Sequence, residues 1–278
     1  MICNGKILDL STPAVMGILN LTPDSFFDGG MNTDNRWEHH VDAMIHEGAD
    51  IIDIGGVSTR PGSLPVAEKE EISRLLQPFR KIRKNFPDAI LSIDTYRSET
   101  ARVLLEEGAD MINDISGGTF DPLIFHTIRK YNVPVIIMHI LGTPRNMQDN
   151  PEYKDVVKEV RQFLMEQAGK LINQGHTDII LDPGIGFGKS IRHNFELLEN
   201  LDSITNTKFP VLVGISRKSM INKILGTTPE TALNGTTVLN TIALLKGASI
   251  LRVHDVKEAR QTIRLVSALQ DVKKGTPE

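Results

Sequence analysis

Eight short apolar runs recur along this chain with helix-like segments between them, and this alternation restricts the folds that it can adopt. Strands that alternate with helices favour a parallel sheet. Eight such units close naturally into a barrel, whereas the alternative, an open doubly wound sheet, usually has fewer strands. We therefore predict a single α/β domain over residues 1–278, a (β/α)8 barrel of the TIM type with parallel strands, ending in a frayed tail at 273–278. The expected strands are 14–19, 51–54, 90–93, 111–112, 135–138, 179–181, 211–213 and 250–251.

A short pattern that repeats three times supports this arrangement. In each copy a helical segment ends on a glycine, an apolar run begins, and a polar residue follows at the same distance from the glycine. The copies are 48–53, 108–113 and 247–252, and their polar residues are Asp53, Asn113 and Arg252. Glycine suits the left-handed conformation that ends many helices. The pattern is what repeated helix and strand units would produce.

The composition limits the partners of the chain. The net charge is −4, so no overall field attracts nucleic acid, and an anionic ligand must be held by local basic groups. The single cysteine, Cys3, excludes an internal disulfide and a cysteine-rich zinc site. The start of the chain lacks a secretory apolar segment, and no run approaches the roughly 18 apolar residues of a membrane span. We expect a cytoplasmic protein that binds neither nucleic acid nor membranes.

Polar residues follow nearly all of the apolar runs. In a closed barrel the C-terminal ends of the strands meet at one rim, where such barrels carry their chemistry. This placement favours an enzyme. The residues are Asn20, Asp94, Asn113, His139, Asp182, Lys218, Arg252 and His254, and the second run opens into a loop that carries Thr59 and Arg60.

Acceptor groups form one expected part of the rim. Asp94, Asn113 and Asp182 would make a wall suited to a flat ring with adjacent N–H and NH2 groups, and Lys218 could serve a ring carbonyl or ring nitrogen. Buried carboxylates are costly unless they meet donors. The alternative is that each Asp only caps a helix. Convergence of several such residues on one rim favours a binding site.

Cationic groups form the second expected part. Arg252 and His254 lie two residues apart in a strand and so share a face, and Asn20 would lie across the junction of the first and last strands. This arrangement suits a phosphate group. The alternative is a surface arginine that pairs with Asp255. Residues 216–218 add further cations near the zone where barrels often hold phosphate.

Two familiar types of site are not expected. The glycine-rich segment 182–190 has Pro183 where a P-loop needs glycine, and Lys189 where a dinucleotide-binding loop needs a small residue. It would still let a flat ligand approach the backbone closely, although it could also be a turn with a helix-capping aspartate. The histidines of 39–46 and the acidic residues of 28–42 have the spacing of no metal site and are expected on a solvated surface.

Taken together, these motifs resemble those of the bacterial dihydropteroate synthases. The matching segments are 16–26, 55–62, 92–95, 113–116, 182–189, 216–218 and 252–255, in the order of that family. The resemblance implies a (β/α)8 barrel that joins 6-hydroxymethyl-7,8-dihydropterin diphosphate to 4-aminobenzoate and releases diphosphate in folate synthesis. Sulfonamides mimic the aminobenzoate in that family.

The resemblance also implies roles for individual residues. The positions that match pterin contacts are Asp94, Asn113, Ile115, Met138, Asp182, Phe187, Gly214 and Lys218. Those that match diphosphate contacts are Asn20, Thr59, Arg252 and His254, with Asn20 also facing Mg2+. Those that match the aminobenzoate region are Phe26, Thr59, Arg60, Pro61, Ser216 and Lys218. The catalytic set is expected to be Asp94, Asp182, Lys218, Arg252 and His254.

One departure and two alternatives accompany this interpretation. Val57 stands where the family usually carries Glu, and we expect it to alter hydrogen bonds within the second loop. A pterin-binding methyltransferase barrel could share the acidic wall, but it would not need the Thr59-Arg60-Pro61 segment. A non-catalytic pterin or anion carrier is the other alternative. The family resemblance further implies a homodimer, for which the apolar surface of 236–245 is a candidate interface.

Overall fold

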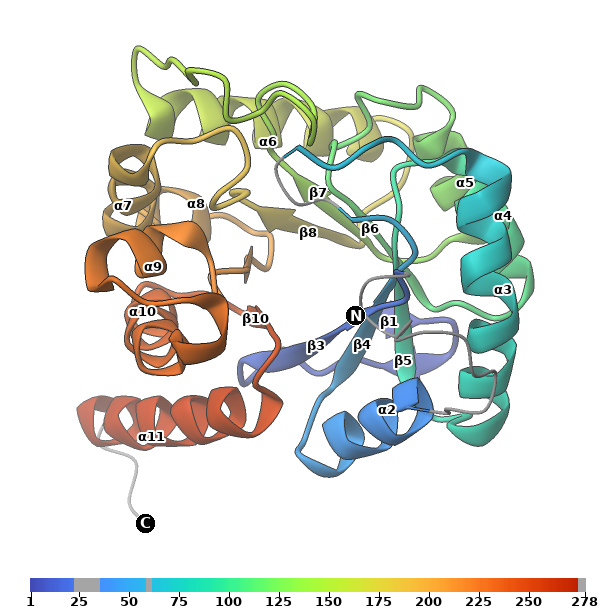
Figure 1. Cartoon of the computed structure of the whole chain (residues 1–278), viewed down its shortest axis with the longest axis horizontal. Helices are drawn as coiled ribbons and strands as arrows, with labels where there is room; N and C mark the ends of the chain where they lie inside the picture. Colours follow the sequence, from blue (N-terminus) through green and yellow to red (C-terminus); the bar gives the residue numbers. More distant parts are fainter. Residues whose placement is uncertain (23–35, 59–61, 275–278) are drawn as a thin grey trace.

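The computed structural model describes residues 1–22, 36–58 and 62–274. Its centre is a barrel of eight parallel strands surrounded by helices (Figure 1). All eight predicted strands are present. They are β3 (Ala14–Asn20), β4 (Ile51–Gly55), β5 (Ile90–Asp94), β6 (Met111–Asp114), β7 (Val135–Met138), β8 (Ile179–Asp182), β9 (Leu212–Val213) and β10 (Ile250–Val253).

The strands follow one another around the barrel. Hydrogen bonds connect them in the order β8-β7-β6-β5-β4-β3-β10-β9, and a parallel bridge between Leu181 and Val211 joins β8 to the segment entering β9. The first and last long strands are neighbours, with Met16 opposite Arg252. The barrel is therefore closed, and the open doubly wound sheet is excluded.

Helices cover the outside of the barrel. Those described are α2 (Arg36–His46), α3 (Glu68–Asn85), α4 (Ser98–Glu106), α5 (Ile124–Tyr131), α6 (Val156–Ile172), α7 (Ile191–Glu199), α8 (Asp202–Thr205), α9 (Ser219–Leu225), α10 (Leu233–Leu245) and α11 (Val256–Lys274), with a 3-10 turn, η1, at Pro229–Thr231. The three glycines of the repeated pattern have left-handed backbones, with φ of 98°, 95° and 91° at Gly48, Gly108 and Gly247. Lys273 and Lys274 belong to α11 and not to the expected tail, and residues 275–278 lie outside the described residues.

The interior of the barrel changes in polarity along its axis. Residues at the N-terminal ends of the strands, such as Met16, Ile51 and Met111, form an apolar cluster inside the barrel. One inward-facing position further along, β4 and β6 carry Asp53 and Asn113, which are also buried. The outward-facing residues between these positions pack against the helices. The apolar layer thus closes one end of the barrel, and the polar layer lies at the other end.

A two-stranded hairpin at the N-terminus covers the apolar end. It pairs β1 (Ile2–Cys3) with β2 (Lys6–Ile7), and Cys3 packs into the inner apolar cluster. Its turn residues, Asn4 and Gly5, have φ of 48° and 85°. Asn-Gly is the preferred pair for a two-residue hairpin turn with positive φ at both positions. The Asn4-Gly5 pair therefore indicates this hairpin in the sequence, although the hairpin was not among the predicted elements.

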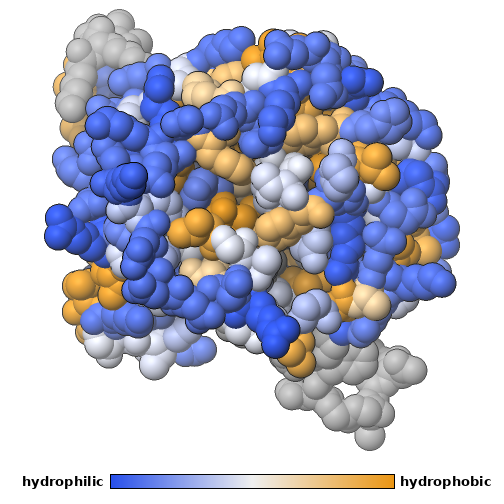
Figure 2. Space-filling model, turned by 90° about the horizontal axis from the view of Figure 1, so that it is seen from above, coloured by the Kyte–Doolittle hydropathy of each residue, from blue (hydrophilic) through white to orange (hydrophobic). Residues whose placement is uncertain are grey.

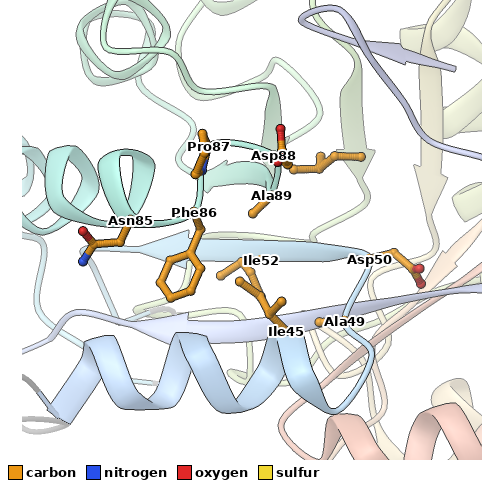
Figure 3. Close-up of a pocket in the computed structure, with 10 residues that line it drawn as sticks. Ile45, Ala49, Asp50, Ile52, Asn85, Phe86, Pro87, Asp88 and Ala89 are labelled. Atoms are coloured by element: carbon orange, nitrogen blue, oxygen red, sulfur yellow. The ribbon is translucent and has the colours of Figure 1, made fainter.

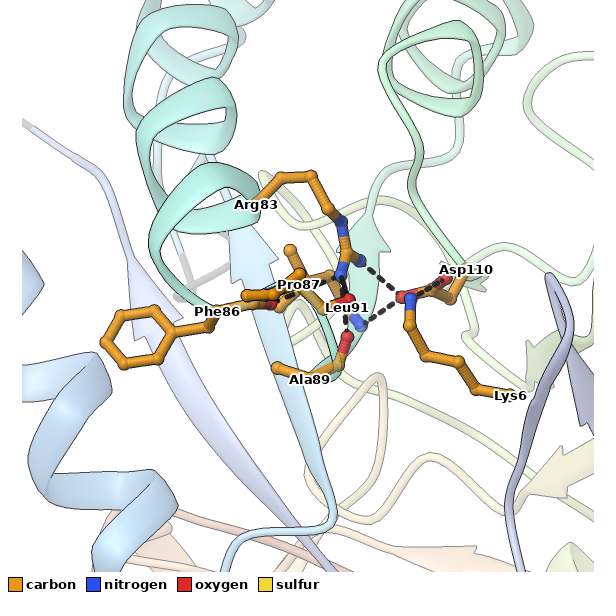
Figure 4. A network of polar contacts seen from close by, with 7 residues as sticks. All are labelled: Lys6, Arg83, Phe86, Pro87, Ala89, Leu91 and Asp110. Carbon is orange, nitrogen blue, oxygen red and sulfur yellow. Dashed lines mark hydrogen bonds and ion pairs between the residues drawn. The ribbon is translucent and has the colours of Figure 1, made fainter.

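A buried carboxylate ties the hairpin to the barrel (Figure 4). Asp110 is fully buried, pairs with Lys6 at 2.7 Å and with Arg83, and accepts the backbone N–H of Leu91 at 2.8 Å. Arg83 also donates to the carbonyl oxygens of Pro87 and Ala89, both at 2.9 Å. This network joins the hairpin, the C-terminal end of α3 and the start of β5.

The surface shows no membrane-spanning feature among the described residues. None of the described helices is both long and apolar enough to cross a bilayer. The face in Figure 2 is mostly hydrophilic, with smaller apolar areas between the hydrophilic residues.

Replacement of Asp110 by Ala should destabilise the protein by about 3 kcal/mol, because it leaves the Arg83 guanidinium without its buried counter-ion. Replacement of Lys6 by Met should cost less than about 1 kcal/mol, since a partly exposed partner contributes little. Urea unfolding of both variants checks this difference. Equal losses would contradict the view that Asp110 is the centre of the network.

Candidate functional site

A cavity of about 350 Å³ opens at the C-terminal mouth of the barrel. It lies beside the last inward-facing residues of β3 and β10 and the loops that follow β8 and β9. Seven of the predicted site residues line it, namely Asn20, Phe187, Gly214, Ser216, Lys218, Arg252 and His254. The structure therefore brings together residues that lie more than two hundred positions apart.

Arg252 connects this cavity to the acidic wall. Its Nε donates to Asp53 Oδ2 at 2.7 Å, and its Nη2 donates to Asp94 Oδ2 at 2.8 Å. The alternative pairing with Asp255 is wrong, because Asp255 binds Arg217, with Nη2 2.5 Å from Oδ1. Burial opposes the charge on Arg252, but Asp53 and Asp94 outweigh burial and raise its pKa. Arg252 is thus held at the mouth by two carboxylates.

Asp53 is a central residue that the sequence analysis did not assign to the site. It is fully buried, and its Oδ2 also accepts a hydrogen bond from Asn113 Nδ2 at 2.9 Å. Asp53, Asn113 and Arg252 are the three polar residues of the repeated glycine pattern, and in the closed barrel Asp53 contacts the other two. That equal offset was the available signal. Asp53 lies inside the apolar run 51–54 and not at its end, so the position within the run alone does not mark it as a site residue.

The two carboxylates of the wall, Asp94 and Asp182, have raised pKa values. Burial raises the pKa of Asp94, Arg252 opposes the rise, and the nearby charge of Asp53 adds to it. Burial also raises the pKa of Asp182, opposed by Lys218 and by the backbone N–H of Gly184. Burial thus disfavours the charged form of both carboxylates, and N–H groups from a ligand would stabilise that form.

The glycine-rich loop after β8 has a tight conformation. Asp182 Oδ1 accepts the backbone N–H of Gly184 at 2.7 Å, so the aspartate stabilises a turn. It does not cap α7, because Ser190 accepts the N–H of His193 at 3.1 Å in that role. Gly184 has φ of 65°, and a Cβ built there would lie 2.0 Å from the carbonyl oxygen of His139. Only glycine fits this close approach between the loops after β7 and β8.

Lys189 holds the same loop from inside. Its buried ammonium lies 2.9 Å from the carbonyl oxygens of Gly184 and Phe187 and 2.9 Å from His139 Nδ1. Burial and the charge of Lys189 lower the pKa of His139 to about 3. His139 is therefore a neutral support for the loop. Its position at a strand end had suggested a place on the rim.

An apolar slot adjoins the wall. Ile115, Met138 and Met147 pack together with Phe187. The family resemblance implies pterin contacts for Ile115, Met138 and Phe187, and these roles stay a prediction. The Lys218 ammonium lies 4.7 Å from the centre of the Phe187 ring and donates to the carbonyl oxygen of Ile185. Burial lowers the pKa of Lys218 to about 8, although Asp182 opposes this. A cation and an aromatic face thus border the slot.

The other side of the mouth carries Ser216 and His254. The Ser216 hydroxyl lies 2.9 Å from His254 Nδ1 and accepts the His254 backbone N–H at 3.2 Å. These contacts fix the histidine beside Asn20 in the wall of the cavity. This is the predicted anion-binding side.

Two side-chain oxygen atoms that could bind a divalent cation lie near Gly55. A Cβ built there would lie 3.6 Å from Asn20 Oδ1 and 3.7 Å from Asp94 Oδ2, so the glycine leaves space beside two oxygen donors. Oxygen atoms suit Mg2+. Within 1–22, 36–58 and 62–274, no three His, Cys, Asp or Glu side chains form a metal-binding group. His39, His40 and His46 are exposed on α2, as expected.

The second loop falls partly outside the described residues. Thr59, Arg60 and Pro61 lie there, and so does Phe26 of the first loop. Around them, Arg74 donates to the Gly56 carbonyl oxygen at 3.1 Å, and Arg97 donates to the Val66 carbonyl oxygen at 2.5 Å. The expected effect of Val57 on this loop stays a prediction.

A larger cavity of about 440 Å³ lies at the opposite end of the barrel (Figure 3). It is formed by the residues that precede β4 and β5 and by the C-terminal ends of α2 and α3, with Phe86, Ile45 and Ile52 grouped in its wall. Its charged lining residues, Asp50 and Asp88, are both acidic, and Asp50 pairs with Arg260. The cavity at the C-terminal mouth differs from this one, because Lys218, Arg252 and His254 line it and Arg252 binds the carboxylates of Asp53 and Asp94.

Comparison with known proteins agrees with this geometry. The family described as "Pterin binding enzyme" matches residues 16–254. The dihydropteroate synthase of Escherichia coli (strain K12) is 41% identical to this chain, covering 99% of this chain and 98% of its own. The chain belongs to the dihydropteroate synthase family. The corresponding protein of Synechocystis sp. is 46% identical over 92% of this chain and 89% of its own.

Solved structures of the family have the same fold. The Yersinia pestis dihydropteroate synthase in complex with a sulfonamide drug superposes with a TM-score of 0.91 at 39% identity, covering 98% of this chain and 99% of that chain. The Xanthomonas albilineans enzyme in complex with 7,8-dihydropteroate gives 0.87 at 36% identity, covering 96% and 97%. The (β/α)8 barrel and the enzyme class predicted from the motifs are confirmed.

The lowered pKa of Lys218 predicts a pH limit on ligand binding. As the pH rises through about 8 the ammonium loses its proton. Affinity for the pterin diphosphate should then fall on the order of tenfold, because a charge-assisted hydrogen bond is lost. Titration calorimetry between pH 6.5 and 9.5 measures this. The Lys218→Arg variant should lack the step, since a guanidinium keeps its charge throughout; the same step in that variant would assign it to another group.

Proposed function

We propose that this mouth catalyses the dihydropteroate synthase reaction, with its residues divided into three adjoining subsites. The methylene carbon of 6-hydroxymethyl-7,8-dihydropterin diphosphate becomes bonded to the amine of 4-aminobenzoate, and diphosphate leaves. The observation that carries the proposal is the meeting of Asp94, Arg252 and Asp53 at a cavity lined by Lys218 and His254. It places ring acceptors and anion-binding cations side by side.

The pterin ring occupies the acidic wall and the apolar slot. Asp94, Asn113 and Asp182 accept its N–H groups, and Lys218 donates to it. Ile115, Met138 and Phe187 contact its faces and edges. A Cβ on Gly214 would lie 3.8 Å from Arg252 Cβ and 3.9 Å from Lys218 Nζ, so a side chain there would narrow the space between the two cations. Glycine keeps this position open to a flat ring.

The diphosphate and the aminobenzoate occupy the outer part of the mouth. Asn20, Thr59, Arg252 and His254 bind the diphosphate. In the structure Arg252 is paired with Asp94, and ring N–H groups that bind Asp94 would replace that contact and release Arg252 Nη2 toward the anion. The residues that bind 4-aminobenzoate are Phe26, Thr59, Arg60, Pro61, Ser216 and Lys218.

The chemistry requires stabilisation of separated charge. The bond between the methylene carbon and the diphosphate oxygen breaks with its electron pair on the oxygen, and the pterin ring delocalises the positive charge that remains. Asp94 and Asp182 stabilise that cation, while Arg252 and His254 stabilise the departing anion. The aniline nitrogen then donates its lone pair to the carbon and loses one proton to water. Closure of the first two loops would exclude water from the carbon.

Asn20, whose Oδ1 lies beside Gly55, would hold Mg2+ in the outer part of the mouth. The ion, when bound, neutralises part of the charge on the diphosphate.

In keeping with the single free cysteine, Cys3, we place the reaction in the cytoplasm.

The purified protein should release diphosphate and form 7,8-dihydropteroate only when both substrates and Mg2+ are present. Chelation by EDTA should lower the rate at least on the order of tenfold, and added Mg2+ should restore it. The Asp182→Asn variant is the matched negative control. It keeps the side-chain shape but loses the acceptor charge that the ring needs, so it should form little product. Pterin binding without diphosphate release by the unaltered protein would instead indicate a carrier.

An exposed apolar face over α9, α10 and α11 supports a homodimer. On α11, Leu265, Leu269 and Val272 are 74%, 50% and 78% exposed, and their spacing of four and three residues puts them on one side of the helix. Val238 and Leu245 of α10 are 51% and 48% exposed, and α10 packs against α11. Exposed apolar residues on two helices that pack together are typical of an interface. We propose that a second copy of the chain covers it.

The double variant Leu265→Glu/Leu269→Glu should be a monomer, because it places two charges in the proposed interface. Light scattering after size-exclusion chromatography measures the mass. Ile7→Glu is the control, since Ile7 is 79% exposed on the N-terminal hairpin, away from this face, and its mass should equal that of the unaltered dimer. A monomeric unaltered protein would contradict the proposal.

A further inference from the structure

Asp53 has an unusual position for a carboxylate. It lies within β4, with Ile18 of β3 and Ser92 of β5 as its strand neighbours, and it is fully buried inside the barrel. Its Oδ2 accepts from both Arg252 Nε and Asn113 Nδ2. One oxygen atom therefore contacts a residue of the anion-binding side and a residue of the ring-binding wall.

The contact with Asn113 decides which way that amide points. A carboxylate oxygen that already accepts from Arg252 can only accept, so the NH2 group of Asn113 must face Asp53. The amide oxygen Oδ1 is then the group left for a ligand. Without the negative charge of Asp53, the amide could rotate and present a donor to the ring N–H groups.

The contact with Arg252 decides how the guanidinium is presented. Nε is held by Asp53 and Nη2 by Asp94, while Nη1 has no hydrogen-bond partner among the described residues. Removal of Asp53 would leave Asp94 as the only carboxylate paired with Arg252. The arginine would then compete more strongly with the ring for Asp94.

Stability alone does not explain this residue. The Oδ1 atom of Asp53 and the Oγ atom of Ser92, its strand neighbour, are both buried without a hydrogen-bond partner in the described structure. Unsatisfied buried polar atoms are costly, and buried ion pairs can often be replaced by apolar residues without loss of stability. An apolar side chain would fill this position without that cost, as apolar side chains do in the neighbouring layer of the barrel interior.

We propose that Asp53 is a positioning residue that orients Arg252 and Asn113 together, and so couples the anion-binding side of the mouth to its ring-binding wall. The inference rests on the proposed function for the identity of the two ligands. Asp53 contacts neither ligand. Its effect is transmitted through the Nε of Arg252 and the Nδ2 of Asn113.

The Asp53→Asn variant tests this, because it keeps the shape of the side chain and removes its charge. Affinities for 6-hydroxymethylpterin and for inorganic diphosphate, each measured alone by calorimetry, should both fall about tenfold, the effect of one charge-assisted contact at each side. The KM for 4-aminobenzoate should change by less than about twofold, because the described residues of that subsite, Ser216 and Lys218, form no hydrogen bond with Asp53. Ser92→Ala is the matched control and should retain all three values.

Thermal unfolding of the same variants separates positioning from folding. Unaltered affinities for both ligands in a less stable Asp53→Asn protein would overturn the proposal and leave Asp53 a structural residue. If that variant does not fold, Asp53→Glu provides the test, since its longer side chain keeps the charge but displaces Arg252. Because the same oxygen atom also holds Asn113, this variant should weaken both diphosphate binding and pterin binding about tenfold, and unaltered binding of both ligands would overturn the proposal. Absence of turnover in the unaltered protein would overturn the proposed function alone, because these binding measurements need no reaction.

Discussion

The charges inside the barrel mouth depend on one another, and the rest of the site is arranged around this dependence. Asp53 and Asp94 are buried where carboxylates are costly, and Arg252 is buried where a guanidinium is costly, so neither kind of group is tolerable there without the other. Burial raises the pKa of Asp94 and of Asp182, so further hydrogen bonds to these carboxylates would stabilise their charged forms. A ligand that offers N–H groups and a departing anion satisfies both needs at once.

The scaffold supplies the rigidity that such a site requires. The apolar layer and the N-terminal hairpin close one end of the barrel. Solvent can therefore approach the polar layer only from the C-terminal mouth. Lys189 and Gly184 fix the loop after β8 through backbone carbonyl contacts, and that loop carries Phe187. Preorganised donors and acceptors cost no reorganisation when charge develops. The loop after β8 is thus a fixed wall of the mouth.

Sequence reasoning reached most of the described site but not its internal connections. Strand-end residues such as Asn20, Asp182 and Lys218 were predicted because a parallel barrel brings all its strand ends to one rim. The partners of Arg252 were not predicted, since they lie 158 and 199 positions away and the neighbouring Asp255 was the local candidate. The contact between His139 and Lys189 was not predicted for the same reason, because it forms only when the loops after β7 and β8 pack together.

The sequence by itself determined the periodic alternation of strands and helices, the glycines that end the helices and the polar residues that follow the strands. These features depend on local backbone preferences and on burial, which act over a few residues. Tertiary structure alone decided that Asp53, Asn113 and Arg252 meet. Their equal offset in three repeated units becomes a contact only when the barrel closes and turns the inward face of β4, β6 and β10 toward one axis.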